Sequence, residues 1–432
     1  MSFVRKAAVI SGGTMSTAVL GMLQSVVIAR ALGPDDTGQF RLAITLSTTA
    51  VSFLVFGLSQ SNVYFLNKKK ADPSAILSNS LLYSAVLGTV SAGVIYALFT
   101  YLPGYTGHYP RAVIAAFAAA MPLLHLAIVL RPILIAQMRS LDYSLSQLVP
   151  RLAVLAPAAG LALVGALFLD VALVLVAVSE VVAVALLLVY LRKNVVIPPR
   201  PDLSLLSRTY RYGLQLYAVN LLTMIDQQIA VLFLGFLVPG EFEMIGFFTR
   251  AMAICGLIRL VPNSIALLLY SYWSSADRNR PEQAQMVLRF AVATGLVLAV
   301  VVAIAGKPLI IVLYGRAFLP AYAPLMVLVA QQVLWVVSRI FQSLFSGRGK
   351  PMLASYSLLL SNGVSVIGLL LLIPRWDIVG AAVAVTAGQA CCVVLNMVQA
   401  RIHFGLRIGS CLLLRPSDLA LLWDRVRRIL RR

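Results

Sequence analysis

Several arginines stand inside long apolar stretches of this sequence, an unusual position for a residue that is always charged. Arg259 has Asn263 one helical turn further on, and Arg339 stands in a polar row that ends at Gln342. A charge at the centre of a bilayer costs about 2.5–3.5 kcal/mol on insertion scales, so a membrane arginine is expected to face a partner or water. The planar donors of a guanidinium match a phosphate or a pyrophosphate. These positions therefore predict a binding site for an anionic ligand.

Arginines nearer the ends of the apolar stretches extend this candidate site. Arg131 lies toward one such end, where its long side chain can reach the interface. Three further arginines and one amide on a polar helix face complete the set: Arg30, Arg41, Arg250 and Gln24. Because arginines outnumber acids within the apolar stretches, the pattern favours an anionic cargo over an organic cation.

Asp226 is the one acid placed deep in an apolar stretch outside residues 170–191. Asn220 and Thr223 precede it at three-residue steps, which makes one helix face polar. We expect Asp226 to couple a proton or another cation to transport, with Glu180 as the second choice. Asp226 and Arg259 could instead neutralise each other, and the sequence leaves these two roles open.

Motifs for catalysis or nucleotide hydrolysis are missing from the sequence. Residues 347–351 (GRGKP) contain glycines and a lysine without the spacing of a phosphate-binding loop, so ATP is not expected to drive the process directly. The histidines and cysteines show no metal-ligand spacing. Asp35 and Asp36 stand among the glycine and proline residues that are typical of a turn. We therefore predict a protein without enzymatic activity, cofactor or metal.

The composition places all these residues in a membrane protein. Of the 432 residues, 60% are hydrophobic and 12% are charged, and that charged share is about half of what a soluble chain carries. A membrane-spanning helix needs about 20 apolar residues. The candidate spans are residues 7–30, 38–66, 78–101, 111–138, 145–168, 170–191, 206–237, 244–273, 286–314, 320–346, 352–374 and 378–401. The expected fold class is an all-α integral membrane protein with about twelve transmembrane helices.

Basic residues alternate between the loops that join these spans. The net charge is +20, from 35 Lys and Arg against 15 Asp and Glu, and basic residues gather in every second loop, as at 68–70 and 192–211. The positive-inside rule and anionic headgroups account for this pattern, so membrane lipids are expected as partners and nucleic acid is not. The alternation predicts an even number of helices with both termini in the cytoplasm.

The polar segment 192–205 divides the spans into two groups, because its three prolines cannot continue a helix. We expect an N-terminal six-helix lobe over 1–191, a cytoplasmic linker over 192–205, a C-terminal six-helix lobe over 206–401 and a basic amphipathic cytoplasmic tail over 402–432. An internal repeat supports two pseudo-symmetric lobes. Leu-Gly, a proline with acids, Gly-x-Phe and an arginine follow an apolar helix at 32–41 and again at 234–250.

Four short motifs, taken in their order and spacing, resemble the polysaccharide-exporting branch of the superfamily that also contains multidrug and toxin extruders. They are residues 28–38 (IARALGPDDTG), 313–322 (LYGRAFLPAY), 347–351 (GRGKP) and 373–382 (IPRWDIVGAA). The resemblance implies two six-helix bundles in a V shape and alternating access in the plasma (inner) membrane of a bacterium. It also implies export of undecaprenyl-pyrophosphate-linked oligosaccharides for O-antigen, capsule or exopolysaccharide. A proton or sodium ion as the coupling ion, and polysaccharide polymerase machinery as a partner, belong to the same expectation.

Departures from related subfamilies narrow the function. Peptidoglycan-precursor flippases carry arginine where Ala18 stands and Arg-Asp where Gln24 and Ser25 stand, so their substrate is not expected here. Multidrug extruders often carry an acid in the first helix, and none stands between Arg5 and Asp35. The leading hypothesis is a flippase for a lipid-linked anionic glycan. The alternatives are a cation-coupled multidrug antiporter and a membrane-embedded glycan polymerase or transferase.

Overall fold

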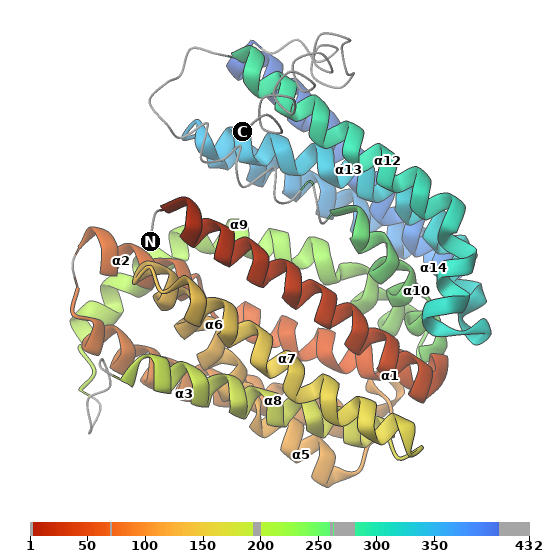
Figure 1. Cartoon of the computed structure of the whole chain (residues 1–432), viewed down its shortest axis with the longest axis horizontal. Coiled ribbons are helices and arrows are strands. Elements are labelled where there is room, and N and C mark those ends of the chain that lie inside the picture. Colours follow the sequence, from red (N-terminus) through yellow and green to blue (C-terminus); the bar gives the residue numbers. More distant parts are fainter. Residues whose placement is uncertain (1–2, 70, 193–199, 260–261, 263–280, 406–432) are drawn as a thin grey trace, which may run out of the picture. The chain divides into compact units, whose positions relative to one another are not determined.

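The computed structural model describes residues 3–69, 71–192, 200–259, 262 and 281–405, and these form helices joined by short connections (Figure 1). Helices pair their own backbone polar groups, which is why a chain inside lipid adopts them. The helices are α1 (Phe3–Leu54), α2 (Leu58–Lys68), α3 (Pro73–Tyr101), α4 (Pro103–Thr106), α5 (Arg111–Ala119), α6 (Met121–Ala136), α7 (Ser140–Leu163), α8 (Leu169–Tyr190), α9 (Leu203–Leu237), α10 (Phe242–Cys255), α12 (Pro281–Tyr314), α13 (Tyr322–Gly347) and α14 (Pro351–Phe404), with 3-10 turns η2 (Gly256–Arg259) and η3 (Arg316–Ala321).

Within the described residues, 9 segments are long and apolar enough to cross a membrane, so the chain is a multi-pass membrane protein. The first, Gly12–Leu54, has 43 residues and the last, Pro351–Phe404, has 54, which is about two spans each. The first is broken at Gly33 (φ 75°) and the last at Asp377 (φ 48°), where the sequence predicts one span to end and the next to begin. The predicted span 244–273 lies partly outside the described residues, so the count of about twelve stays a prediction.

Two predicted spans are interrupted in the structure. Within the predicted span 38–66, α1 ends at Leu54 and α2 begins at Leu58, and the intervening Phe56 and Gly57 have φ values of 45° and 71°. Within 111–138, α5 and α6 meet just before Pro122, whose ring lacks the N–H that would continue the ladder of α5. Hydrophobicity does not reveal either break, because the residues on both sides remain apolar.

The chain forms two compact units. Unit 1 comprises Met1–Thr249 and Leu313–Phe318, and unit 2 comprises Arg250–Val312 and Leu319–Arg432. The predicted lobes are divided at the polar segment 192–205, and both that division and the V shape stay predictions. Most of the predicted tail lies outside the described residues.

Unit 1 is a layered bundle in which α7 packs against α1 and α8, while α6 packs against α2 and α3. Figure 1 shows α1 and α7 running alongside each other. An apolar core joins α2, α3, α6, α8 and the start of α9; it includes Phe65, Ile76, Leu77, Leu130, Ile133, Leu187 and Leu205. Packing of this kind fixes the register of the helices that carry the polar residues described below.

The two copies of the repeated turn lie against each other within unit 1. A Cβ atom added at Gly38 would lie 1.7 Å from the carbonyl oxygen of Phe242, and one added at Gly246 would lie 2.2 Å from the carbonyl oxygen of Pro34. Backbones in membrane proteins approach this closely only where small residues stand at the crossing. The glycines of the two Gly-x-Phe motifs therefore allow the backbones of the two segments to cross closely.

Unit 2 is built on α13 and α14, which pack along each other. Its core contains Val292, Val336, Ile340, Phe341, Phe345 and Val393. On the polar side of this contact, Asn396 Nδ2 donates to Ser338 Oγ at 2.8 Å. Helix α12 joins α13 through Gly295, whose added Cβ would meet Val336 at 3.4 Å. This framework holds the arginines of α13 and of the preceding η2 turn.

Candidate functional site

A group of polar side chains from four helices lies in unit 1, and we call it the arginine cluster. It consists of Gln24 on α1, Arg131 on α6, Gln147 and Arg151 on α7, and Glu180 on α8. Arg151 Nη1 donates to Gln24 Oε1 at 3.3 Å, and Glu180 interacts electrostatically with both arginines. Arg151 is exposed, whereas Arg131 and Glu180 are half-buried. The cluster therefore reaches from the surface of the unit into its interior.

Several polar atoms of the arginine cluster are buried without a hydrogen-bond partner among the described residues. They are Arg131 Nε, Gln147 Nε2 and Glu180 Oε2. An unmet buried polar group costs about 1–3 kcal/mol, and a native protein carries few of them. Arg131 Nε and Glu180 Oε2 stand on neighbouring helices, and Gln147 Nε2 stands one helical turn before Arg151. These open groups mark a candidate site that a polar ligand or water can complete.

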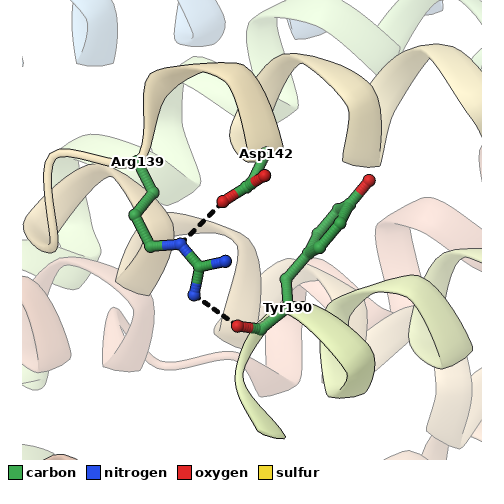
Figure 2. Close-up of polar contacts among 3 residues, drawn as sticks. All are labelled: Arg139, Asp142 and Tyr190. Atoms are coloured by element: carbon green, nitrogen blue, oxygen red, sulfur yellow. Dashed lines mark hydrogen bonds and ion pairs between the residues drawn. The ribbon is translucent and has the colours of Figure 1, made fainter. Parts of the chain in front are cut away.

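Two contacts of Arg139, which we call the Arg139 clamp, join the start of α7 to the end of α8. Arg139 Nε donates to Asp142 Oδ2 at 2.6 Å, and Arg139 Nη1 donates to the carbonyl oxygen of Tyr190 at the end of α8 (Figure 2). From this clamp, Arg151 lies about 18 Å along α7 and Glu180 lies about 15 Å along α8. Because these neighbouring helices run antiparallel, the clamp brings Arg151 and Glu180 to a similar depth.

Arg259 forms a second basic site, in unit 2. It ends the η2 turn, its Nε donates to Gln332 Oε1, and its guanidinium carbon lies 4.5 Å from the ring centroid of Trp335. Gln332 in turn donates to Gln331. The contact with the tryptophan ring and the hydrogen bond to the Gln332 side chain orient the guanidinium but leave it half-exposed. Arg259 is thus a cation held in a set direction by Gln332 and Trp335 of α13, a contact that was not predicted from the sequence.

Arg339 lies one helical turn beyond Trp335 on α13. Its Nη1 reaches Gln342 Oε1 at 3.5 Å, the outer limit of a hydrogen bond. The side chain is half-buried. Toward the part of the chain that the structure describes, Arg339 therefore keeps most of its donors available.

The remaining predicted residues are spread over the chain. Arg30 Nε donates to the carbonyl oxygen of Leu313 at 2.9 Å, which ties the segment Leu313–Phe318 to α1. Arg250 is 6% exposed, and Arg41 and Asp226 are half-buried; each of them takes part in polar or electrostatic interactions. Asn263 lies outside the described residues. Asp226 and Arg259 belong to different units, so their mutual neutralisation stays a prediction.

The break between α1 and α2 adds a polar feature that the sequence does not reveal. Tyr217 Oη donates to the freed carbonyl oxygen of Phe53 at 2.7 Å, and His125 Nε2 donates to that of Leu54 at 3.4 Å. His125 Nδ1 then accepts from Ser84 Oγ at 3.0 Å, as a neutral imidazole can. A cavity of about 160 Å³ adjoins this break. Interrupted helices beside polar cavities are a recurring feature of membrane transporters.

Arg151 and Gln147 are functional candidates that the sequence prediction left out. They stand four residues apart within an apolar stretch, so they share one helix face. That spacing was the available signal. The apolar residues around them conceal which face is turned inward.

Long apolar helices, arginines held among them and an interrupted helix together describe a multi-pass membrane protein with polar groups inside its spans. The sequence profile of the family described as "polysaccharide biosynthesis protein" matches residues 3–274, more than half of the chain, and the chain belongs to this family. No curated protein matches the sequence.

Solved structures share the fold. The chain is similar to the lipid II flippase MurJ in an inward closed conformation, with a TM-score of 0.73 at 12% identity over 91% of this chain and 87% of that one. It is also similar to an inward-facing multidrug resistance MATE family transporter of the MOP superfamily, with a TM-score of 0.69 at 14% identity over 90% and 94% of the chains. A MOP superfamily transporter from Pyrococcus furiosus, reported with a binding pocket of reverse polarity, matches with a TM-score of 0.62 at 16% identity over 93% and 95%. The chain therefore combines membership of the polysaccharide biosynthesis protein family with the fold that these solved transporters share.

Proposed function

We propose that the protein is a flippase that moves an undecaprenyl-pyrophosphate-linked oligosaccharide from the cytoplasmic to the outer leaflet of a bacterial plasma membrane by alternating access. The cargo would be a repeat unit of O-antigen, capsule or exopolysaccharide. The observation that carries the proposal is the arginine cluster, in which Arg131 Nε and Gln147 Nε2 are buried donors without an acceptor among the described residues. A pyrophosphate supplies several acceptor oxygens and the negative charge that two guanidinium groups require.

The charge balance of the cluster supports an anionic cargo. Arg131 and Arg151 carry two positive charges against one on Glu180, so the group has a net charge of +1. No direct ion pair joins Glu180 to either arginine within the described residues. The arginines are therefore only partly compensated by the protein, and a bound anion would complete the compensation.

Glu180 offers a way to couple cargo binding to a proton. A proton on Glu180 would raise the charge of the three groups from +1 to +2 and would strengthen the attraction for a pyrophosphate. Asp226, the first choice from the sequence, is half-buried on α9 and remains a coupling candidate. Glu180 has the more direct effect because it lies within the proposed anion site.

A cation-coupled multidrug antiporter is the alternative, since MATE transporters share the fold. An organic cation would gain nothing from the two arginines of the cluster, and this disfavours the antiporter. Depletion of the protein in its host separates the two functions. We expect a lipid-linked oligosaccharide to accumulate on the inner leaflet. Gained drug sensitivity without such an intermediate would overturn the proposal in favour of the antiporter.

A further inference from the structure

A basic pocket lies in unit 1, away from the arginine cluster. It is a cavity of about 640 Å³ where the end of α2 meets the first turns of α3 and α9. Its walls include Phe65, Lys69, Leu205, Arg208, Arg211 and Tyr212. The lining thus combines aromatic and aliphatic groups with three cations.

Contacts between α2, α3 and α9 give this basic pocket a fixed frame. The rings of Tyr64 and Tyr212 stack with centroids 4.2 Å apart. Ser61 Oγ donates to the carbonyl oxygen of Thr209 at 2.6 Å, deep between α2 and α9. Asn79 Nδ2 donates to the carbonyl oxygen of Asp202 at 2.9 Å and thereby joins α3 to the start of α9. The pocket is therefore built by packed helices.

The two carboxylates in the wall are already engaged by the backbone. Asp72 accepts from the Ser74 amide at 3.1 Å and caps α3, and Asp202 accepts from the Ser204 and Leu205 amides at 2.9 and 3.0 Å and caps α9. Both helices direct the positive ends of their dipoles toward the pocket. The acids thus serve the helix ends, and they offset only part of the positive charge.

The cations of the pocket retain donors for a ligand. Among the described residues, neither the Lys69 ammonium nor the Arg211 guanidinium hydrogen bonds to or pairs with another group, and both are exposed. Arg208 donates from Nε to the carbonyl oxygen of Ser204 at 3.3 Å, and its terminal nitrogens make no hydrogen bond to the residues that the structure describes. An ammonium and two guanidinium groups around one cavity match the oxygens of a phosphate.

We propose that this basic pocket binds the phosphate headgroup of an anionic phospholipid from the surrounding leaflet. The cavity lies at the first turn of α3, where a membrane span begins at Pro73. It lies on the side that the basic loops predict to be cytoplasmic, and that leaflet supplies anionic headgroups. The wall of Phe65, Leu205 and Tyr212 suits the glycerol and upper acyl chain of a lipid, which a free phosphate lacks. The proposal is independent of the cargo and of the arginine cluster.

Two double variants with the same change of charge test this site. Lys69→Gln/Arg211→Gln removes two cations from the pocket wall. Lys68→Gln/Arg200→Gln removes two exposed cations from the same surface outside the wall. Binding of short-chain phosphatidylglycerol to the purified full-length protein in neutral detergent can be followed by native mass spectrometry and by the shift in unfolding temperature. Neither variant removes the capping side chains of Asp72 and Asp202. Gel filtration and the unfolding temperature in lipid-free detergent check that both variants fold.

We expect wild-type protein to bind phosphatidylglycerol in preference to phosphatidylcholine. The wall variant should lose about thirtyfold in apparent affinity, at about a factor of five for each basic residue, and the surface variant should keep wild-type affinity. Equal losses in both variants would show diffuse surface attraction and would overturn the proposal. Stabilisation by inorganic phosphate or glycerol 1-phosphate equal to that by the lipid would identify a soluble phosphate as the ligand, which would also overturn it.

Discussion

The crossing of the repeated turns in unit 1 yields a sharp prediction. We consider Gly38→Ala, which adds one methyl group where the Phe242 carbonyl oxygen would lie 1.7 Å away. An ordinary contact between carbon and a carbonyl oxygen is about 3.3–3.6 Å. The two backbones would have to separate by about 1.6–1.9 Å, and a backbone atom cannot rotate away as a flexible side chain can.

Two opposing effects determine how much Gly38→Ala lowers the free energy of unfolding. Overpacking costs about 1–3 kcal/mol, and a backbone clash falls at the upper end of that range. Alanine is favoured over glycine inside a helix by about 1 kcal/mol, which offsets part of the cost. The net destabilisation is about 2 kcal/mol, which for a chain of this size lowers the unfolding temperature by about 2–4 °C.

The matched control is Gly21→Ala on the same helix, where an added Cβ meets no atom within 4 Å. It should keep or raise the unfolding temperature, because it gains the helix preference without a clash. Fluorescence-monitored unfolding of both purified variants in one detergent measures the difference. Equal unfolding temperatures for Gly38→Ala and Gly21→Ala would refute the close crossing and the packing argument built on it.

Three further predictions concern charge. Glu180→Gln mimics the protonated acid, so transport into proteoliposomes should persist but lose its dependence on external pH; an unchanged pH profile would remove Glu180 from the coupling step. Arg259→Lys keeps the charge but loses the planar contact with Trp335 and Gln332, and we expect about a tenfold loss of transport at equal expression; wild-type rates would show that orientation of the guanidinium does not matter. Hydrogen bonds from the Leu205 amide and Ser204 lower the pKa of Asp202 below 3.8, so its cap stabilises fully above about pH 4 and is lost as the pH falls through the lowered pKa. The gap in unfolding temperature between wild type and Asp202→Ala should therefore close in acid, and a gap that persists there would contradict the assignment.

The membrane spans could be predicted from the sequence because their signal is local. About 20 apolar residues with few charges suffice, and a turn such as residues 32–38 marks where one span ends. The family could also be predicted, since the motifs at 28–38 and 313–322 keep their order and spacing. The break at Phe56 and Gly57 could not, because a single glycine in an apolar stretch is common and the backbone departs from the helix only in its tertiary setting.

The candidate site could be predicted in part. Arg131 and Gln24 belong to the arginine cluster, but Arg151 joins them through the packing of α7 against α1, where it donates to Gln24, and against α8, where Arg139 contacts Tyr190. Arg30 was predicted to belong to the site, but its Nε donates to the carbonyl oxygen of Leu313, 283 positions away. No local pattern indicates a partner at that separation. Burial and pairing of a charge depend on packing between distant segments, which residue type and spacing do not encode.

Transport by a variant of the arginine cluster tests the central claim most directly. Purified protein in proteoliposomes would be given a fluorescent polyprenyl-pyrophosphate oligosaccharide. A quencher that reaches only the outer leaflet would measure how much of the fluorescent substrate has crossed the membrane. Each charge-assisted hydrogen bond contributes about 1.5–3 kcal/mol, so Arg131→Gln/Arg151→Gln should reduce translocation by about a hundredfold or more. Arg111→Gln, which removes an exposed arginine at the start of α5, should leave it unchanged. Wild-type translocation by the double variant would contradict a pyrophosphate site at the arginine cluster.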